Sequence, residues 1–229
     1  MSHGPTPSDV AAVYLQQGPY AQGHDPHGHG HAEARGHGAG GPAPKRVIVG
    51  YGFWIFLLSD IVMFSGFFAA YAVLAHATAG GPTGRELFDL KRVGIETACL
   101  LASSFTCGLG YVAALQRKQL QTQFWMFVTG LLGLVFVILE VLEFYEMIVK
   151  GAGPGRSAFL SAFFALVGCH GLHVTIGGLW LATMMAQIWV KGFKPQIMRR
   201  LLCFNLFWHA LDIIWVALFT IVYLLGAGA

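Results

Sequence analysis

Charged residues are scarce in this sequence. Only 11% of its 229 residues are Asp, Glu, Lys or Arg, whereas 55% are hydrophobic. A soluble domain normally carries about 25% charged residues, so this chain has too few to cover a water-facing surface. The charges are also bunched, and the stretches between them reach the length of about 20 apolar residues that crosses a bilayer. The composition therefore predicts a small helical bundle in a membrane.

Other features are lacking as well. The net charge of +3 includes no basic run typical of a nucleic-acid surface, so no nucleic acid is expected as a partner. The four cysteines form no Cys-x-x-Cys pair, which argues against a disulfide framework or a zinc site. Residues 1–46 contain no apolar stretch typical of a signal peptide.

Residues 1–46 are polar and rich in Gly, Pro and His. Such a segment cannot bury enough apolar surface to offset the entropy of ordering, so we expect a disordered tail. Its histidine-rich run from His24 to His31 is compatible with weak transition-metal binding, but the interpretation we favour is a solvated tail.

The remaining part, residues 47–229, is predicted to be a single transmembrane domain. It contains five apolar segments, each long enough to be a helix whose backbone groups are all paired internally, as hydrocarbon demands. Their approximate limits are 47–75, 93–116, 123–149, 157–189 and 199–226. The predicted fold class is therefore all-α, an integral membrane bundle of five transmembrane helices with short connections and antiparallel neighbours.

The distribution of Lys and Arg predicts the orientation. With the N-terminus inside, nine basic residues lie on the inner side, namely Arg35, Lys45, Arg46, Arg117, Lys118, Lys191, Lys194, Arg199 and Arg200. Five lie on the outer side, namely Arg85, Lys91, Arg92, Lys150 and Arg156. We therefore expect a cytoplasmic N-terminus, with the tail in the cytoplasm, and a periplasmic C-terminus.

Nine ionisable side chains fall inside the predicted spans. Each costs roughly 2.5–3.5 kcal/mol at a helix centre on the insertion scale, so each calls for a partner or a task. They are Asp60, Glu96, Glu140, Glu143, Glu146, His170, His173, His209 and Asp212. By the rise per residue, Glu146 is near the outer surface and Glu96 about one turn inside it, whereas His209 and Asp212 lie near the middle of the membrane.

Three helices each carry a polar pair spaced three residues apart, which places both members on one helix face. The pairs are Glu140 with Glu143, His170 with His173, and His209 with Asp212. The simplest way to bury them is to turn the pairs towards one another in a hydrogen-bonded network. Three interpretations stay open for that network: structural contacts between helices, a proton path or antenna, or ligation of haem or metal by the histidines.

Asp60 stands apart from these pairs. Its span is strongly apolar, and Ser59 is its only adjacent polar residue. We treat it as a candidate functional carboxylate, since an ionisable group in such surroundings is costly to keep.

The polar pairs lie in motifs that resemble subunit III of the haem-copper oxidases. The motifs are Phe53-Trp54-Ile55-Phe56-Leu57-Leu58-Ser59-Asp60, Glu143-Phe144-Tyr145-Glu146, His170-Gly171-Leu172-His173-Val174 and Trp208-His209-Ala210-Leu211-Asp212-Ile213-Ile214-Trp215. They occur in the family's order, and the resemblance extends from about residue 48 to the C-terminus. It implies an accessory subunit without catalytic residues, because the family's haems and copper belong to subunit I.

The resemblance also implies partners and a role. The expected partners are oxidase subunits I, II and IV, together with phospholipids. The family is thought to hold lipids, to support proton uptake and to protect the complex from inactivation during turnover. Its functional acidic residue maps onto Asp60, where many relatives carry the longer Glu. Many relatives also have two additional helices at the N-terminal side, which the bo-type branch lacks, as does this chain.

The electron donor of the complex is a separate question. The loop at residues 79–84 and the run at residues 153–157 resemble the quinol oxidase branch, which favours ubiquinol. A cytochrome c oxidase remains the alternative, since some of these also have a five-helix subunit III. An independent proton-coupled carrier using Asp60 is a second alternative, disfavoured by the odd helix count and the lack of inverted repeats.

Overall fold

The computed structural model describes residues 45–81, 87 and 89–228. Within this part of the chain, all regular structure is helical. The elements are α2 (Lys45–Leu74), α4 (Leu90–Leu115), α5 (Gln119–Val149), α6 (Ala158–Lys191), α7 (Pro195–Leu218), the π-helix η1 (Phe219–Leu224) and α8 (Leu225–Gly228). Five of the helical stretches are long and apolar enough to cross a membrane, α7 continuing into η1.

The predicted five-helix membrane fold is confirmed, with helix ends within a few residues of the limits expected from the sequence. The prediction of a disordered tail, with its histidine-rich run, falls almost entirely on residues outside the described part of the chain. The orientation of the termini across the membrane stays a prediction.

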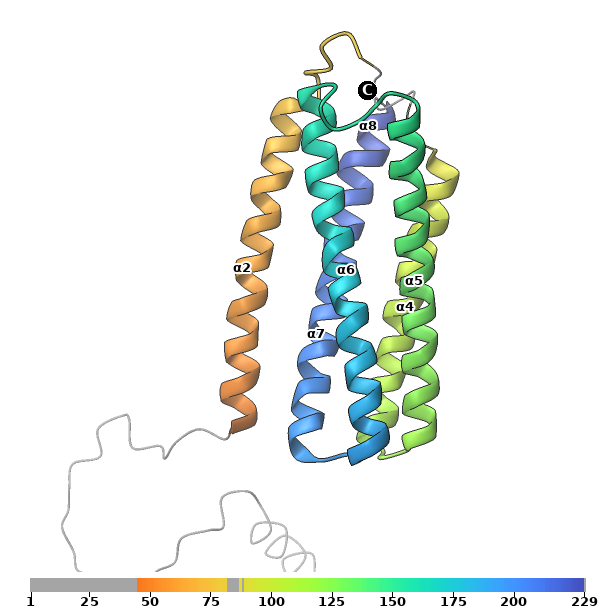
Figure 1. The fold of residues 1–229 in the computed structure, drawn as a ribbon. Helices are drawn as coiled ribbons and strands as arrows, with labels where there is room; N and C mark the ends of the chain where they lie inside the picture. The colour runs from red at the N-terminus through yellow and green to blue at the C-terminus, as the bar shows by residue number, and fades with distance from the viewer. Residues whose placement is uncertain (1–44, 82–86, 88, 229) are drawn as a thin grey trace, which may run out of the picture. The chain divides into compact units, whose positions relative to one another are not determined.

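Helices α4, α5, α6 and α7 form a four-helix bundle, and α2 packs mainly against α6 and α7 (Figure 1). One face of α2 meets the bundle through Leu57, Phe64 and Tyr71, which are all less than 5% exposed. Only 11% of the spanning part of α2 is buried, against 44% for α4 and α6. Helix α2 is therefore peripheral, and most of its apolar surface is left for lipid or for another protein.

Helix ends are set by local sequence. The side chains of Asp89 and Ser157 accept hydrogen bonds from backbone N–H groups in the first turns of α4 and α6, as N-caps do. Gly192 ends α6 with a positive φ of 64°, which glycine adopts without steric cost, and Pro195 is the first residue of α7. Between α4 and α5, Arg117 takes a φ of 57°. These tight turns hold successive helices side by side.

The core of the bundle depends on close approach at two glycines. A Cβ on Gly133 of α5 would lie 2.9 Å from the ring of Trp208, and a Cβ on Gly177 of α6 would lie 3.0 Å from the same ring. The indole of Trp208 therefore occupies space that any larger residue would fill. Its Nε1 donates to the Ser103 hydroxyl of α4 at 3.1 Å, so one side chain joins four helices.

Candidate functional site

Three buried carboxyl groups lie together between α4, α5 and η1. Glu96 is fully buried, and Glu140 and Glu143 are 3% and 5% exposed. The Tyr223 hydroxyl donates to Glu143 Oε2 at 3.1 Å. Tyr223 also interacts electrostatically with Glu96 and Glu140, so the three acids share one region. We call Glu96, Glu140, Glu143 and Tyr223 the carboxyl cluster.

The carboxyl cluster has an ion pair and a small polar pocket on the side facing the 150–157 loop. Arg92 Nη2 lies 2.8 Å from Glu146 Oε1, and both side chains are partly exposed. A pocket of about 110 Å³ is lined by these two residues together with Glu143, Asp89 and Lys150. Glu143 is thus the member of the cluster that reaches a polar opening.

The deeper part of the cluster has apolar surroundings, with Glu140 at the edge of a mainly apolar pocket of about 250 Å³ between α5 and α6. The carboxyl oxygens of Glu96 and Glu140 have no hydrogen-bond partner among the described residues. Glu140 packs directly on α6, since a Cβ on Gly171 would lie 2.5 Å from its Oε1. Buried carboxyls without a cationic partner are costly as charges, but they can hold protons and exchange them with a neighbour. Proton binding is accordingly the chemistry that this arrangement permits.

His170 lies in an aromatic enclosure in the centre of the bundle. It is fully buried, its Nε2 donates to the Leu211 carbonyl at 3.2 Å, and its Nδ1 has no partner among the described residues. Its ring centroid lies 5.1 Å from that of Trp215 and 5.7 Å from that of Phe136. Trp215 in turn donates to the Thr97 hydroxyl at 3.0 Å. The histidine therefore connects α6 to α7.

Asp60 and His173 lie on facing sides of the contact between α2 and α6, which we call the α2–α6 seam. Asp60 is half-buried and interacts electrostatically with the Cys169 thiol. The Nδ1 of His173 donates to the Cys169 carbonyl of its own helix at 2.7 Å, and its ring lies 5.3 Å from that of Phe64. No hydrogen bond or ion pair joins Asp60 to another residue of the described segments.

His209 and Asp212 of α7 face α4. The Asp212 carboxyl interacts with the Ser104 hydroxyl, and it also interacts electrostatically with His209. A Cβ on Gly108 would lie 3.9 Å from His209 Nε2, so the imidazole passes close to the α4 backbone. Both side chains are half-buried, and His209 Nδ1 and Asp212 Oδ1 have no hydrogen-bond partner within the described residues.

The structure therefore brings some of the predicted residues together and separates others. Glu140 and Glu143 lie with Glu96, an intramembrane acid that belongs to none of the three pairs predicted from spacing. The histidine pair is divided between the aromatic enclosure and the seam, and the pair on α7 faces α4. Within the described segments, no hydrogen bond or ion pair links the three carboxyl groups of the cluster to these histidines.

Several polar partners were missed by sequence reasoning. Tyr223, Thr97 and Ser103 each complete a buried hydrogen bond, to Glu143, Trp215 and Trp208 respectively. A signal was present, because a buried indole N–H or phenol needs a partner. The spacing of residues within one helix did not indicate which neighbouring helix would provide it.

The part of the chain that the structure describes contains no group of three or more His, Cys, Asp or Glu side chains placed to hold a metal ion. The four cysteines, all within this part, are free thiols, and Cys107 Sγ lies 3.5 Å from Asn205 Oδ1. His170 and His173 serve hydrogen bonding and ring packing at the positions described above.

The fold and these sites define a multi-pass helical membrane protein whose buried acids and histidines connect helices. The sequence matches the family model of cytochrome c oxidase subunit III over residues 32–227. The chain belongs to this family, whose members are accessory subunits of haem-copper oxidases; the haems and copper are in subunit I. The resemblance stated from the motifs is thereby confirmed.

Relatives with printed functions are similar over most of their length. Cytochrome bo(3) ubiquinol oxidase subunit 3 of Pseudomonas aeruginosa is 52% identical over 177 residues, covering 77% of this chain and 85% of the relative. Quinol oxidase subunit 3 of Bacillus spizizenii is 46% identical over 178 residues, covering 77% and 87%. With five spanning helices and bacterial respiratory relatives, the chain is a multi-pass protein of the bacterial inner membrane.

Proposed function

We propose that this chain is the non-catalytic third subunit of a proton-pumping ubiquinol oxidase. The observation that carries this is the match to relatives named as quinol or ubiquinol oxidase subunits in both Pseudomonas and Bacillus, each covered over 85% or more of its length. The two glycine-proline loops at residues 79–84 and 153–157, which resemble the quinol branch, also favour ubiquinol over cytochrome c as donor.

Membership of the family implies other oxidase subunits as partners. We propose that the chain packs on subunit I and is joined by subunits II and IV, with phospholipids filling the remaining surface. The peripheral position of α2 supports this, because large side chains such as Val62 and Val73 are 70% and 81% exposed on it. Apolar surface of this extent must be covered in the membrane by acyl chains or by a neighbouring helix.

The role proposed for the subunit is stability of the complex and support of proton uptake. In the proposed orientation, the nine basic residues of the inner side mark the cytoplasmic face. Asp60 remains the candidate functional carboxylate, since it lies half-buried in the α2–α6 seam without a hydrogen bond to other described residues. A carboxyl left free in this way is available to bind a proton or to contact a partner subunit.

The test is purification of the intact complex through an affinity tag on this chain. We expect a large haem-bearing subunit to co-purify, and oxygen consumption to be driven by ubiquinol and not by reduced cytochrome c. Oxygen consumption with cytochrome c alone would assign the complex to the other branch. Recovery of the chain without any haem-bearing partner would overturn the proposal.

A further inference from the structure

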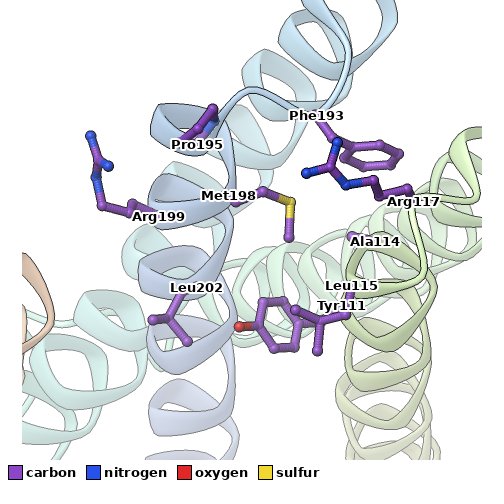
Figure 2. Close-up of a pocket in the computed structure, with 9 residues that line it drawn as sticks. All are labelled: Tyr111, Ala114, Leu115, Arg117, Phe193, Pro195, Met198, Arg199 and Leu202. Carbon is purple, nitrogen blue, oxygen red and sulfur yellow. The ribbon is translucent and has the colours of Figure 1, made fainter. Parts of the chain in front are cut away.

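A pocket opens between the end of α4 and the start of α7, at the end of the bundle where α2 begins. Its volume is about 420 Å³. Figure 2 shows Tyr111 and Met198 between the two helices, with Arg117 above them on the α4 side and Leu202 on α7 level with Tyr111. The Arg199 side chain extends from near the start of α7 on the side away from Arg117. The pocket thus has a polar rim and an apolar interior.

The charge around this pocket has a single sign. Six basic residues occupy this end of the bundle, namely Arg117, Lys118, Lys191, Lys194, Arg199 and Arg200. Neither residues 108–128 nor residues 180–208 include an acidic side chain. Within the described residues, the one ion pair is that of Arg92 and Glu146 at the opposite end, and Arg200 bonds only the neutral Gln187. Among the residues that the structure describes, the cations of this end are therefore uncompensated.

Helix α7 adds to the positive potential at the rim. Its N-cap residue Lys194 makes no side-chain capping bond, and Pro195 follows as the first helical residue. The N–H groups of Ile197 and Met198 donate to the Lys194 carbonyl, so it is the helix dipole at this end that favours an anion. Both Pro195 and Met198 line the pocket, so the first turn of α7 borders the same space as the arginines.

The interior of the pocket selects for an apolar group below the anion. Tyr111 and Leu202 lie about one to two turns further into the membrane than the arginines, on α4 and α7, and Leu115 is the last residue of α4, just before Arg117. Basic pockets between transmembrane helices at headgroup level bind anionic lipid headgroups. A free phosphate would use the rim alone, whereas a phospholipid uses both the rim and the interior.

We propose that this pocket binds an anionic phospholipid, with its phosphate at Arg117 and Arg199 and an acyl chain running past Tyr111 and Leu202. The long arginine side chains can turn towards the headgroup while their stems stay on the apolar surface. The proposal deepens the lipid-holding role given under the proposed function and rests on it. It specifies where on the subunit the lipid binds and that its headgroup is anionic.

The test is a titration of the purified, delipidated complex with phosphatidylglycerol and with phosphatidylcholine, read as bound lipids per complex by native mass spectrometry. We expect one phosphatidylglycerol to bind at least tenfold more tightly than phosphatidylcholine. The double variant Arg117→Gln/Arg199→Gln should lose this preference. The matched variant Lys118→Gln/Lys191→Gln removes the same charge at exposed positions outside the pocket, and it should keep the preference.

A second variant keeps both arginines and blocks the interior. Leu115 is 55% exposed, so Leu115→Trp should leave the fold intact while it occupies the space of the acyl chain. It should weaken binding of phosphatidylglycerol by about the same factor as the arginine variant. The proposal would be overturned if both charge variants lost the preference for phosphatidylglycerol equally, or if Leu115→Trp bound this lipid as tightly as the unsubstituted protein. Displacement of the lipid by millimolar inorganic phosphate would identify an anion site without a lipid preference.

Haem content and ubiquinol-driven oxygen consumption are measured on the same preparations. Failure of the lipid site would leave these two readouts normal in all variants. Failure of the proposed function would instead appear as missing haem or a different electron donor in the unsubstituted protein, while the lipid preference of the chain as purified would still be measurable.

Discussion

The carboxyl cluster and the α2–α6 seam accommodate acidic side chains in different ways. Both place acidic side chains inside membrane-spanning helices. In the cluster, Glu96, Glu140 and Glu143 are buried among helices that pack closely, and Tyr223 closes one side. In the seam, Asp60 is only half-buried, and the helix that carries it touches the bundle along a single face.

The comparison distinguishes acids that are buried in the packing between helices from an acid that a lipid or another subunit can approach. A residue buried in the cluster contributes to how α4, α5 and η1 fit together, so its replacement is expected to affect assembly first. A residue in the seam lies where a lipid or another subunit can approach, so its replacement is expected to affect the working complex first. The predictions below test this division, from the largest expected effect to the smallest.

Substitution Gly171→Leu should have the largest effect. A side chain there must displace the Glu140 carboxyl, whose oxygens lie about where the Cβ would be. Overpacking of this kind costs about 3 kcal/mol, and we expect the yield of intact complex and its melting temperature to fall sharply. Gly178→Leu is the matched control on the same helix, because a Cβ on Gly178 meets nothing within 4 Å. Equal behaviour of the two variants would contradict the close packing of Glu140 on α6.

Substitution Tyr223→Phe should have an intermediate effect. It removes the hydroxyl that donates to Glu143 Oε2 and leaves the phenyl ring in place. Loss of a donor to a buried acceptor costs about 1–3 kcal/mol, which thermal unfolding of the purified complex would measure. Tyr145→Phe at a position 65% exposed on α5 provides the control and should be neutral. Equal melting temperatures of the Tyr223→Phe variant and the unsubstituted complex would show that this hydrogen bond does not contribute to stability.

Substitution Asp60→Asn should leave assembly and the initial rate of oxygen consumption nearly unchanged. If the seam serves sustained turnover, activity should then decay faster over successive turnovers than in the unsubstituted complex. The measurement is a continuous oxygen-electrode trace at saturating ubiquinol. Asp89→Asn, a change at the start of α4 that keeps an N-cap side chain, is the control. Superimposable decay curves would remove Asp60 from any functional role.

Substitution Arg92→Gln should have the smallest effect. The ion pair with Glu146 is partly exposed on both sides, with exposed fractions of 28% and 46%. Such pairs contribute about 0–1 kcal/mol and are weakened by salt. A double-mutant cycle with Glu146→Gln at low and high ionic strength would measure it. A coupling energy well above this range would mean that the pair closes the cluster and is no ordinary surface contact.

The fold was largely predictable from the sequence, because hydrocarbon allows few solutions. Five long apolar segments had to become five helices with internally paired backbones. Three helix starts differ from expectation by three or four residues, because polar residues outside the apolar run still wind into the first turn: α4 begins at Leu90 after its cap Asp89, and α5 and α7 begin at Gln119 and Pro195. The π-helix at Phe219–Leu224 was not predictable, because an apolar segment that is hydrophobic on all sides shows no periodic pattern that would reveal a change of winding.

The candidate site was predictable only in part. A spacing of three residues correctly places Glu140 and Glu143 on the same side of α5, yet it does not specify the neighbour they face. That choice depends on helix rotation, which close contacts such as Trp208 between Gly133 and Gly177 help to determine. The membership of Glu96 and Tyr223 in the cluster follows from that packing, since they come from segments 127 residues apart along the chain.

The wide winding of η1 makes the last turns of the chain sensitive to length. A π-turn accommodates one more residue than the α-helical turn it replaces. Inserting one further residue between Phe219 and Tyr223 would exceed what the wide turn accommodates, and it would carry the phenol roughly 100° around the helix axis. The hydroxyl would then face away from Glu143, so this stretch should accept changes of residue type far more readily than changes of register.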